Sequence, residues 1–95
     1  MYTETSLLEL LKKEDQYVKR LQIWEKSVKE NTKHLDQLLA FHDYMTKTNP
    51  NSYEREVKEY QTRLKNATAS RDKYANKLQT VRDQIKTYLK EVIQV

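Results

Sequence analysis

The chain of 95 residues contains no glycine, no cysteine and a single proline, Pro50. Without glycine it lacks the residue that best suits tight turns, and it cannot form the glycine-rich loops that cradle phosphates. Without cysteine it has no disulfide framework, no thiolate metal site and no thiol nucleophile. Because a single proline leaves long stretches free of the strongest helix breaker, these absences favour long helices.

Long apolar runs are also missing. No stretch of the sequence approaches the about 20 apolar residues that a transmembrane helix requires. The amino terminus, Met-Tyr-Thr-Glu-Thr-Ser, lacks the basic and apolar regions of a cleaved secretory signal. We therefore expect a cytoplasmic protein, with secretion by a route that needs no cleaved signal as the alternative.

The composition limits the kind of core that the chain can build. Hydrophobic residues make up 37% and charged residues 34% of the sequence, which is too polar for a compact core of three layers. Such a charge content also occurs in disordered chains, but disorder does not produce a sustained apolar period. We expect one domain over residues 1–95, built as an extended helical bundle.

The second half of the chain carries a heptad pattern, in which apolar residues recur at alternating intervals of four and three. Twelve of its thirteen positions are apolar or aromatic, and Arg71 is the exception. This period keeps one stripe of an α-helix facing a partner helix, so it predicts a helix over residues 53–95. The thirteen positions are Tyr53, Val57, Tyr60, Leu64, Ala67, Arg71, Tyr74, Leu78, Val81, Ile85, Tyr88, Val92 and Val95.

The first half carries a similar stripe and predicts a helix over residues 6–46. Ser6 is expected to cap its first turn, with Glu9 three residues later completing a capping box. We call the two stripes together the seam, and expect its apolar members to carry the interaction. In the first helix the seam positions are Leu7, Leu10, Glu14, Tyr17, Leu21, Trp24, Val28, Asn31, Leu35, Leu38, His42 and Met45.

A polar segment, Lys47-Thr48-Asn49-Pro50-Asn51-Ser52, separates the two stripes and predicts a turn over 47–52. Two arms of similar length around a short turn favour an antiparallel coiled-coil hairpin. Counted outward from Asn49-Pro50, Asn31 and Thr32 would meet Ala67, Thr68 and Arg71. Asn31 and Arg71 would then form a polar layer that fixes the register, or alternatively a hinge or a docking point for a partner.

The first helix has more apolar surface than one partner helix covers. The additional residues are Leu8, Leu11, Val18, Ile23, Leu39, Phe41 and Tyr44. A second copy of the hairpin would cover them and give a four-helix bundle, because homo-oligomers are most often two-fold dimers. The tyrosines of the second stripe also suit the rim of a larger bundle, where their hydroxyl groups reach water.

Catalytic and metal-binding motifs are not found in the sequence. His34 and His42 are the only histidines, and they lack the additional ligands at matched spacing that a metal site requires. At a seam position, His42 is expected to pack at a buried edge. The carboxylates are interleaved with lysines, as on a solvated helix face. We therefore expect no enzymatic activity, no cofactor and no small-molecule substrate.

The formal net charge of +4 belongs to the second half of the chain. Residues 1–52 hold 8 basic and 8 acidic side chains, whereas residues 53–95 hold 10 and 6. This excess leaves open a polyanion-binding alternative, in which the second helix contacts nucleic acid or an anionic membrane. Acidic residues interrupt the basic ones, which disfavours that alternative relative to protein–protein interaction.

Several segments resemble the carboxy-terminal half of type III secretion needle subunits. They are Asn49-Pro50, Glu59-Tyr60-Gln61-Thr62-Arg63-Leu64, Arg71-Asp72, Val81-Arg82-Asp83 and Val92-Ile93-Gln94. The resemblance implies a small helical hairpin with an Asn-Pro turn that polymerises into a tube. It covers about half of the chain, and residues 6–46 depart from it because they carry a regular heptad and a tryptophan.

The sequence as a whole predicts an all-α protein, a long antiparallel two-helix hairpin that dimerises into a four-helix bundle. We expect a non-enzymatic structural or adaptor protein that acts through coiled-coil interaction and self-assembly. Its partner is expected to be a second copy or another protein. The polyanion-binding protein and the polymerising needle-like subunit are the two alternatives.

Overall fold

The computed structural model describes residues 4–93, which form three helices. They are α1 (Glu4–Ala40), α2 (His42–Thr48) and α3 (Pro50–Ile93). Among the described residues only Phe41 and Asn49 lie outside a helix, and none lies in a strand. The predicted all-α class is therefore confirmed.

The outer ends of the helices differ slightly from the prediction. α1 already includes Glu4, so Ser6 lies inside its first turn rather than before it, and the predicted capping box is wrong. α3 is described as far as Ile93. Val95, the last predicted seam position, lies outside the described residues.

The first predicted helix is interrupted at Phe41. The backbone of Phe41 has φ −100° and ψ 19°, and its N–H donates to the Leu38 carbonyl over 3.2 Å, three residues back instead of four. The helix then resumes as α2, whose Met45 N–H donates to the Phe41 carbonyl over 2.9 Å. The prediction of one helix over 6–46 is therefore wrong at this point. The physical reason is that residues 41–48 are mostly Phe, His, Asp, Tyr and Thr, which have weak helix propensities.

The predicted turn over 47–52 is reduced to one non-helical residue, Asn49. It has φ −155° and ψ 72°, because the ring of the following proline disfavours helical backbone in the residue before it. Pro50 then occupies the first position of α3, where its missing N–H is not needed. The Asn49 carbonyl accepts the N–H of Tyr53 over 3.1 Å and so starts the hydrogen-bond ladder of α3.

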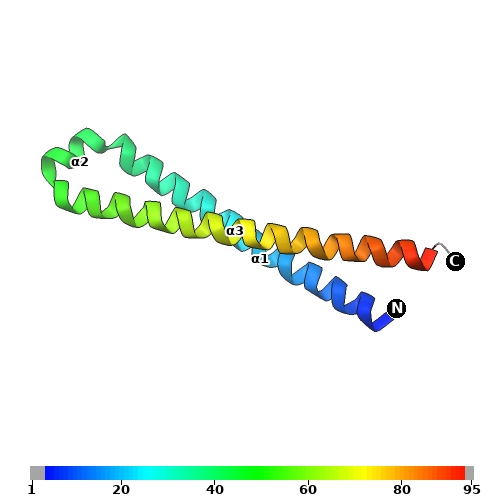
Figure 1. Ribbon diagram of the computed structural model, residues 1–95. Helices are drawn as coiled ribbons and strands as arrows, with labels where there is room; N and C mark the ends of the chain where they lie inside the picture. The colour runs from blue at the N-terminus through cyan, green and yellow to red at the C-terminus, as the bar shows by residue number, and fades with distance from the viewer. Residues whose placement is uncertain (1–3, 94–95) are drawn as a thin grey trace. The chain divides into compact units, whose positions relative to one another are not determined.

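The packing contacts divide the chain into two units, and each contains a part of α1 and a part of α3. Unit 2 is Trp24–Arg71 and includes α2. In unit 2 the chain turns back at α2 (Figure 1), so that the end of α1 and the start of α3 run in opposite directions. The His34 ring stacks on the Tyr60 ring with centroids 5.2 Å apart.

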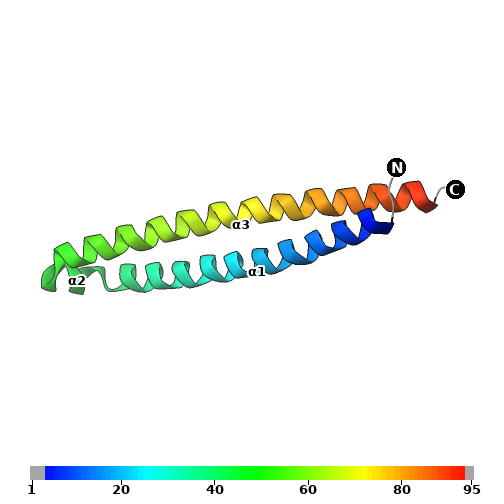
Figure 2. The same ribbon diagram turned by 90° about the horizontal axis from the view of Figure 1, so that it is seen from below.

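Unit 1 consists of the residues up to Ile23 together with those from Asp72 onward. Its parts of α1 and α3 also run in opposite directions (Figure 2). Two contacts fix their pairing. The Arg82 Nε atom lies 3.2 Å from a carboxylate oxygen of Glu14, and the rings of Tyr17 and Tyr74 have centroids 6.2 Å apart.

The pairing in unit 2 differs from the predicted register by about one helical turn. His42 contacts Tyr53. From this pair, each step back to the preceding seam position of the first stripe matches a step forward to the next seam position of the second, and the third such step places Asn31 opposite Leu64. The same steps place Arg71 opposite Trp24. The prediction instead placed Asn31 at the level of Ala67 to Arg71. The prediction counted both arms from Asn49-Pro50. The reversal of the chain instead begins at Phe41 and includes α2, so the centre of the reversal lies earlier in the chain.

Within residues 6–92, whose burial the structure describes, the buried apolar residues all belong to α3. They are Tyr53, Ala67, Leu78, Val81 and Tyr88. Every one of these is a seam position of the second half of the chain. The α1 side of the seam is half-buried, so α3 is covered by α1 more completely than α1 is covered by α3.

Candidate interaction surfaces

The seam residues of α1 and α2 are half-buried, with one exception. His42, predicted to pack at a buried edge, is exposed. The half-buried residues are Leu7, Leu10, Glu14, Tyr17, Leu21, Trp24, Val28, Asn31, Leu35, Leu38 and Met45.

The seam residues of α3 are buried more deeply, apart from Val92, which is exposed near the end of the described residues. In addition to the five buried residues, the half-buried ones are Val57, Tyr60, Leu64, Arg71, Tyr74 and Ile85. Because most seam positions are at least partly covered within their own unit, the surfaces left for a partner lie mainly beside the seam.

The two residues predicted as a polar layer are both half-buried, but the pairing places them at different levels. The Asn31 side-chain amide donates to the Ser27 carbonyl over 2.8 Å and to the Ser27 hydroxyl over 3.2 Å. These bonds run along α1, so its amide N–H groups have partners within their own helix. Counting seam positions from the His42–Tyr53 pair places Arg71 at the level of Trp24 and not at that of Asn31.

His42 has a different environment from the one predicted. The break at Phe41 makes it the first residue of α2, and its Nδ1 atom lies 3.1 Å from the hydroxyl of Tyr53. The two rings meet edge to face, with centroids 5.5 Å apart. The exposed histidine therefore supplies the hydrogen-bond partner of a buried tyrosine.

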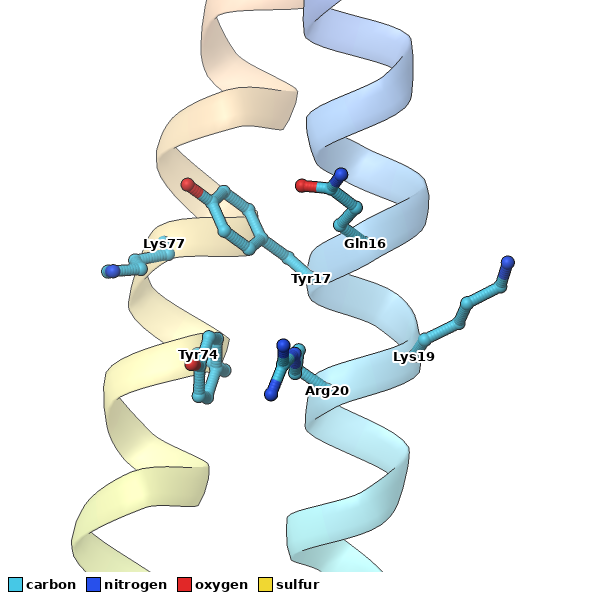
Figure 3. Close-up of a pocket in the computed structure, with 6 residues that line it drawn as sticks. All are labelled: Gln16, Tyr17, Lys19, Arg20, Tyr74 and Lys77. Carbon is cyan, nitrogen blue, oxygen red and sulfur yellow. The ribbon is translucent and has the colours of Figure 1, made fainter.

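One surface of unit 1, which we call the basic groove, is formed by two adjoining hollows of about 400 and 300 Å³ that share Tyr17 and Lys77. Figure 3 shows the larger hollow: Tyr17 and Arg20 of α1 project toward α3, Tyr74 of α3 projects toward α1, and Lys77 extends outward from α3. Four of the lining side chains are cationic, and none is acidic. The lining residues are Lys13, Gln16, Tyr17, Lys19, Arg20, Tyr74, Asn76, Lys77, Thr80, Val81 and Gln84.

Cations and tyrosine rings are in contact along this groove. The Lys77 Nζ atom lies 5.7 Å from the centroid of Tyr17 and 5.5 Å from that of Tyr74, within the range of a cation–π interaction. The Lys73 Nζ atom lies 5.9 Å from the Tyr74 centroid. Lys19 projects away from the other lining residues in Figure 3 and pairs with Asp15 over 3.0 Å.

A second surface lies in unit 2, and we call it the aromatic groove. It encloses about 370 Å³ and has no lysine or arginine in its lining. Phe41 is 62% exposed and Tyr44 is 66% exposed, although both are large and apolar for the most part. The lining residues are His34, Gln37, Leu38, Phe41, Tyr44, Met45, Glu56 and Tyr60.

Most of the exposed large apolar residues that the structure describes lie in the first part of the chain. Six of the eight in the described residues lie on α1, at Phe41 or on α2, and the other two lie on α3. The first six are Leu8, Leu11, Ile23, Leu39, Phe41 and Tyr44, and the other two are Leu89 and Val92. The sequence singled out the first six as excess apolar surface of the first helix.

The basic groove was missed by the sequence analysis, although a signal for it exists. Lys13, Arg20 and Lys77 each stand immediately before a seam residue, so they flank the seam on both helices. The charge count by halves of the chain hid this signal, because it assigned the positive excess to the second helix. Two of the three cations come from the first.

The described residues hold no group of three or more His, Asp or Glu side chains arranged to bind a metal ion. No helix within residues 4–93 is both long and apolar enough to cross a membrane.

Comparisons with protein-family models, with curated proteins and with solved structures find no match to this chain. The resemblance to needle subunits therefore stays a prediction from the residues that suggested it.

Proposed function

We propose that this protein is a non-enzymatic structural or adaptor protein, an antiparallel coiled-coil hairpin that self-associates into a four-helix bundle. The observation that carries this proposal is that Phe41 and Tyr44, both largely exposed, line one groove together, whereas most of the α3 seam is buried or half-buried. Large apolar residues that are exposed side by side mark a contact surface. The cytoplasmic location expected from the sequence belongs to the same proposal.

A second copy of the chain is the proposed partner, because homo-oligomers are most often two-fold dimers. A two-fold dimer would cover the exposed apolar side chains by pairing the same surface of both copies.

The charges favour the aromatic groove as the centre of this contact. Its lining contains one acidic residue, Glu56, and no lysine or arginine, so two copies meet there without strong repulsion. Phe41 and Tyr44 supply apolar area that is largely exposed in one chain and would be buried in the dimer. Burying a side chain such as Phe41 completely contributes about 1.5 to 3 kcal/mol, and a two-fold contact counts it twice.

Size-exclusion chromatography with light scattering at tens of micromolar tests the proposal. We expect a mass twice the 11.5 kDa of one chain. Because Phe41 is exposed, Phe41→Ser should keep the helical circular dichroism and raise the dimer dissociation constant at least about tenfold. Phe41→Leu should retain the dimer, and Lys47→Ser, an exposed change on α2, serves as the control.

Three results would contradict the proposed dimer. The first is a monomeric mass for the unmodified chain, and the second is equal masses for Phe41→Ser and the unmodified chain. The third is particles far larger than a dimer, which would support the polymerising alternative. Salt separates the remaining alternative, because apolar association should barely change between about 50 and 200 mM salt whereas polyanion binding should weaken steeply.

A further inference from the structure

We propose that the basic groove of unit 1 binds an acidic helix of a different protein, with carboxylates one heptad apart. This inference goes beyond self-association, because it concerns another surface and another kind of partner. It begins from the charges of the groove. Four of the lining residues are cationic and none is acidic, whereas the whole chain mixes 18 basic with 14 acidic residues.

Two of the four cations are available to a ligand. Lys19 is held by Asp15 at 3.0 Å and points away from the other lining residues, as Figure 3 shows, so it is set aside. Lys77 lies over the rings of Tyr17 and Tyr74 and extends outward from α3, so it is set aside as well. Lys13 and Arg20 remain. A second copy presenting the same groove would bring these like charges together, so the groove does not suit a two-fold contact between copies.

The spacing of the cations matches a helical ligand. Lys13 and Arg20 are seven residues apart on α1, which is about 10 Å along the helix. Two carboxylates at positions i and i+7 of a partner helix lie on one face with the same separation. Charge pairs at positions flanking a seam are the contacts that select partners and orientation in coiled coils. Arg20 can also bind a carboxylate through two parallel N–H···O bonds.

The two tyrosines provide the apolar floor of the site. Tyr17 and Tyr74 are half-buried, and their rings lie 6.2 Å apart between α1 and α3. Their remaining exposed area would be covered by apolar residues between the two carboxylates of the partner. Apolar contact is needed because exposed ion pairs alone contribute little to affinity.

The same contacts disfavour single-stranded nucleic acid as the ligand. Proteins that bind it stack bases on open aromatic faces. Here Lys77 lies over both tyrosine rings and Lys73 over Tyr74. A long phosphate backbone would also run past Asp15, which lies next to the groove on α1. Discrete carboxylates on a partner helix avoid that acid.

Fluorescence anisotropy with the full chain at about 50 mM salt tests the inference. The probe is a labelled helical peptide with glutamate at two positions one heptad apart and leucine between them. The comparison probes are the same peptide with glutamine at both positions and a single-stranded oligothymidylate. The groove variant is Lys13→Glu/Arg20→Glu, and the control is Lys58→Glu/Lys65→Glu. Each changes the formal net charge from +4 to zero, and the control lies on exposed positions of α3 in unit 2.

We expect the glutamate peptide to bind, and more tightly than the glutamine peptide or the oligonucleotide. The groove variant should weaken its binding at least about tenfold, and the control less than about twofold. Equal losses in both variants, tighter binding of the oligonucleotide or no binding of the glutamate peptide would each overturn the inference. If the groove variant loses helical circular dichroism, Lys13→Gln/Arg20→Gln takes its place.

The inference and the proposed function fail in different ways. The mass of the groove variant by light scattering should equal that of the control variant, because the dimer contact lies at the aromatic groove. A groove variant that becomes monomeric would show that two copies meet at the basic groove, which contradicts the inference. If Phe41→Ser has the same mass by light scattering as the unmodified chain, only the proposed self-association is contradicted.

Discussion

Tyr53 shows how a single polar contact can shape the reversal of the chain. Its side chain is 4% exposed, and its hydroxyl lies 3.1 Å from His42 Nδ1. A buried tyrosine needs a hydrogen-bond partner for its hydroxyl, because an unpaired one loses its bonds to water without compensation. His42 therefore joins the start of α2 to the start of α3, across the non-helical Asn49.

A double-mutant cycle measures this contact. His42→Ala should lower the free energy of unfolding by about 1 kcal/mol, because it leaves the Tyr53 hydroxyl without a partner. In the Tyr53→Phe background the same change should cost much less, since no hydroxyl remains to be satisfied. Urea denaturation followed by circular dichroism gives the four free energies. Strictly additive effects would show that the two side chains do not interact.

At the scale of elements, α3 is the part of the fold that the sequence predicted best. All five buried residues fall on its heptad positions, although the stripe includes the small Ala67 and the charged Arg71. The prediction was correct because the spacing of apolar residues along the sequence determines which face of a coiled-coil helix is buried. No proline or glycine interrupts this spacing in α3 after Pro50.

The burial of α3 predicts different costs for two leucines on its two faces. Leu78 is 5% exposed and Leu89 is 42% exposed. Leu78→Ala should lower the free energy of unfolding by about 2 to 5 kcal/mol, because it leaves a cavity in the seam. Leu89→Ala should cost less than about 1 kcal/mol. Urea denaturation at low protein concentration compares them, and equal costs would show that the seam of α3 is misplaced.

The reversal of the chain was predicted less well than either helix. No glycine or proline stands at Phe41, and the heptad positions continue to Met45, so the sequence predicted no break there. The prediction therefore placed the centre of the turn at Asn49-Pro50 and aligned Asn31 with the residues near Arg71. The observed contacts of His34 and His42 move this alignment by about one helical turn. Register depends on where the reversal begins, which weak local propensities decide.

At the scale of the whole molecule, the sequence predicted the kind of surface better than its location. It identified the excess apolar residues of the first helix, and the structure leaves six of them exposed, among them Phe41 and Tyr44. It did not find the basic groove, since that surface combines Lys13 and Arg20 from α1 with Lys77 from α3. These residues are far apart in the chain, so their proximity can be predicted only when the pairing of the two helices is known.

The central claim is that the chain turns back at α2, so that in unit 2 the end of α1 and the start of α3 run in opposite directions. Because the chain has no cysteine, Lys26→Cys/Ala69→Cys accepts spin labels at these two exposed positions of unit 2 and nowhere else. Pulsed electron paramagnetic resonance, with the labelled protein diluted in unlabelled chain, then measures the distance within one molecule. Pairing of the two helices predicts about 25 to 35 Å, from axes about 10 Å apart and labels on their outer sides. A distance near 65 Å, as expected for 43 residues of uninterrupted helix, would contradict the account.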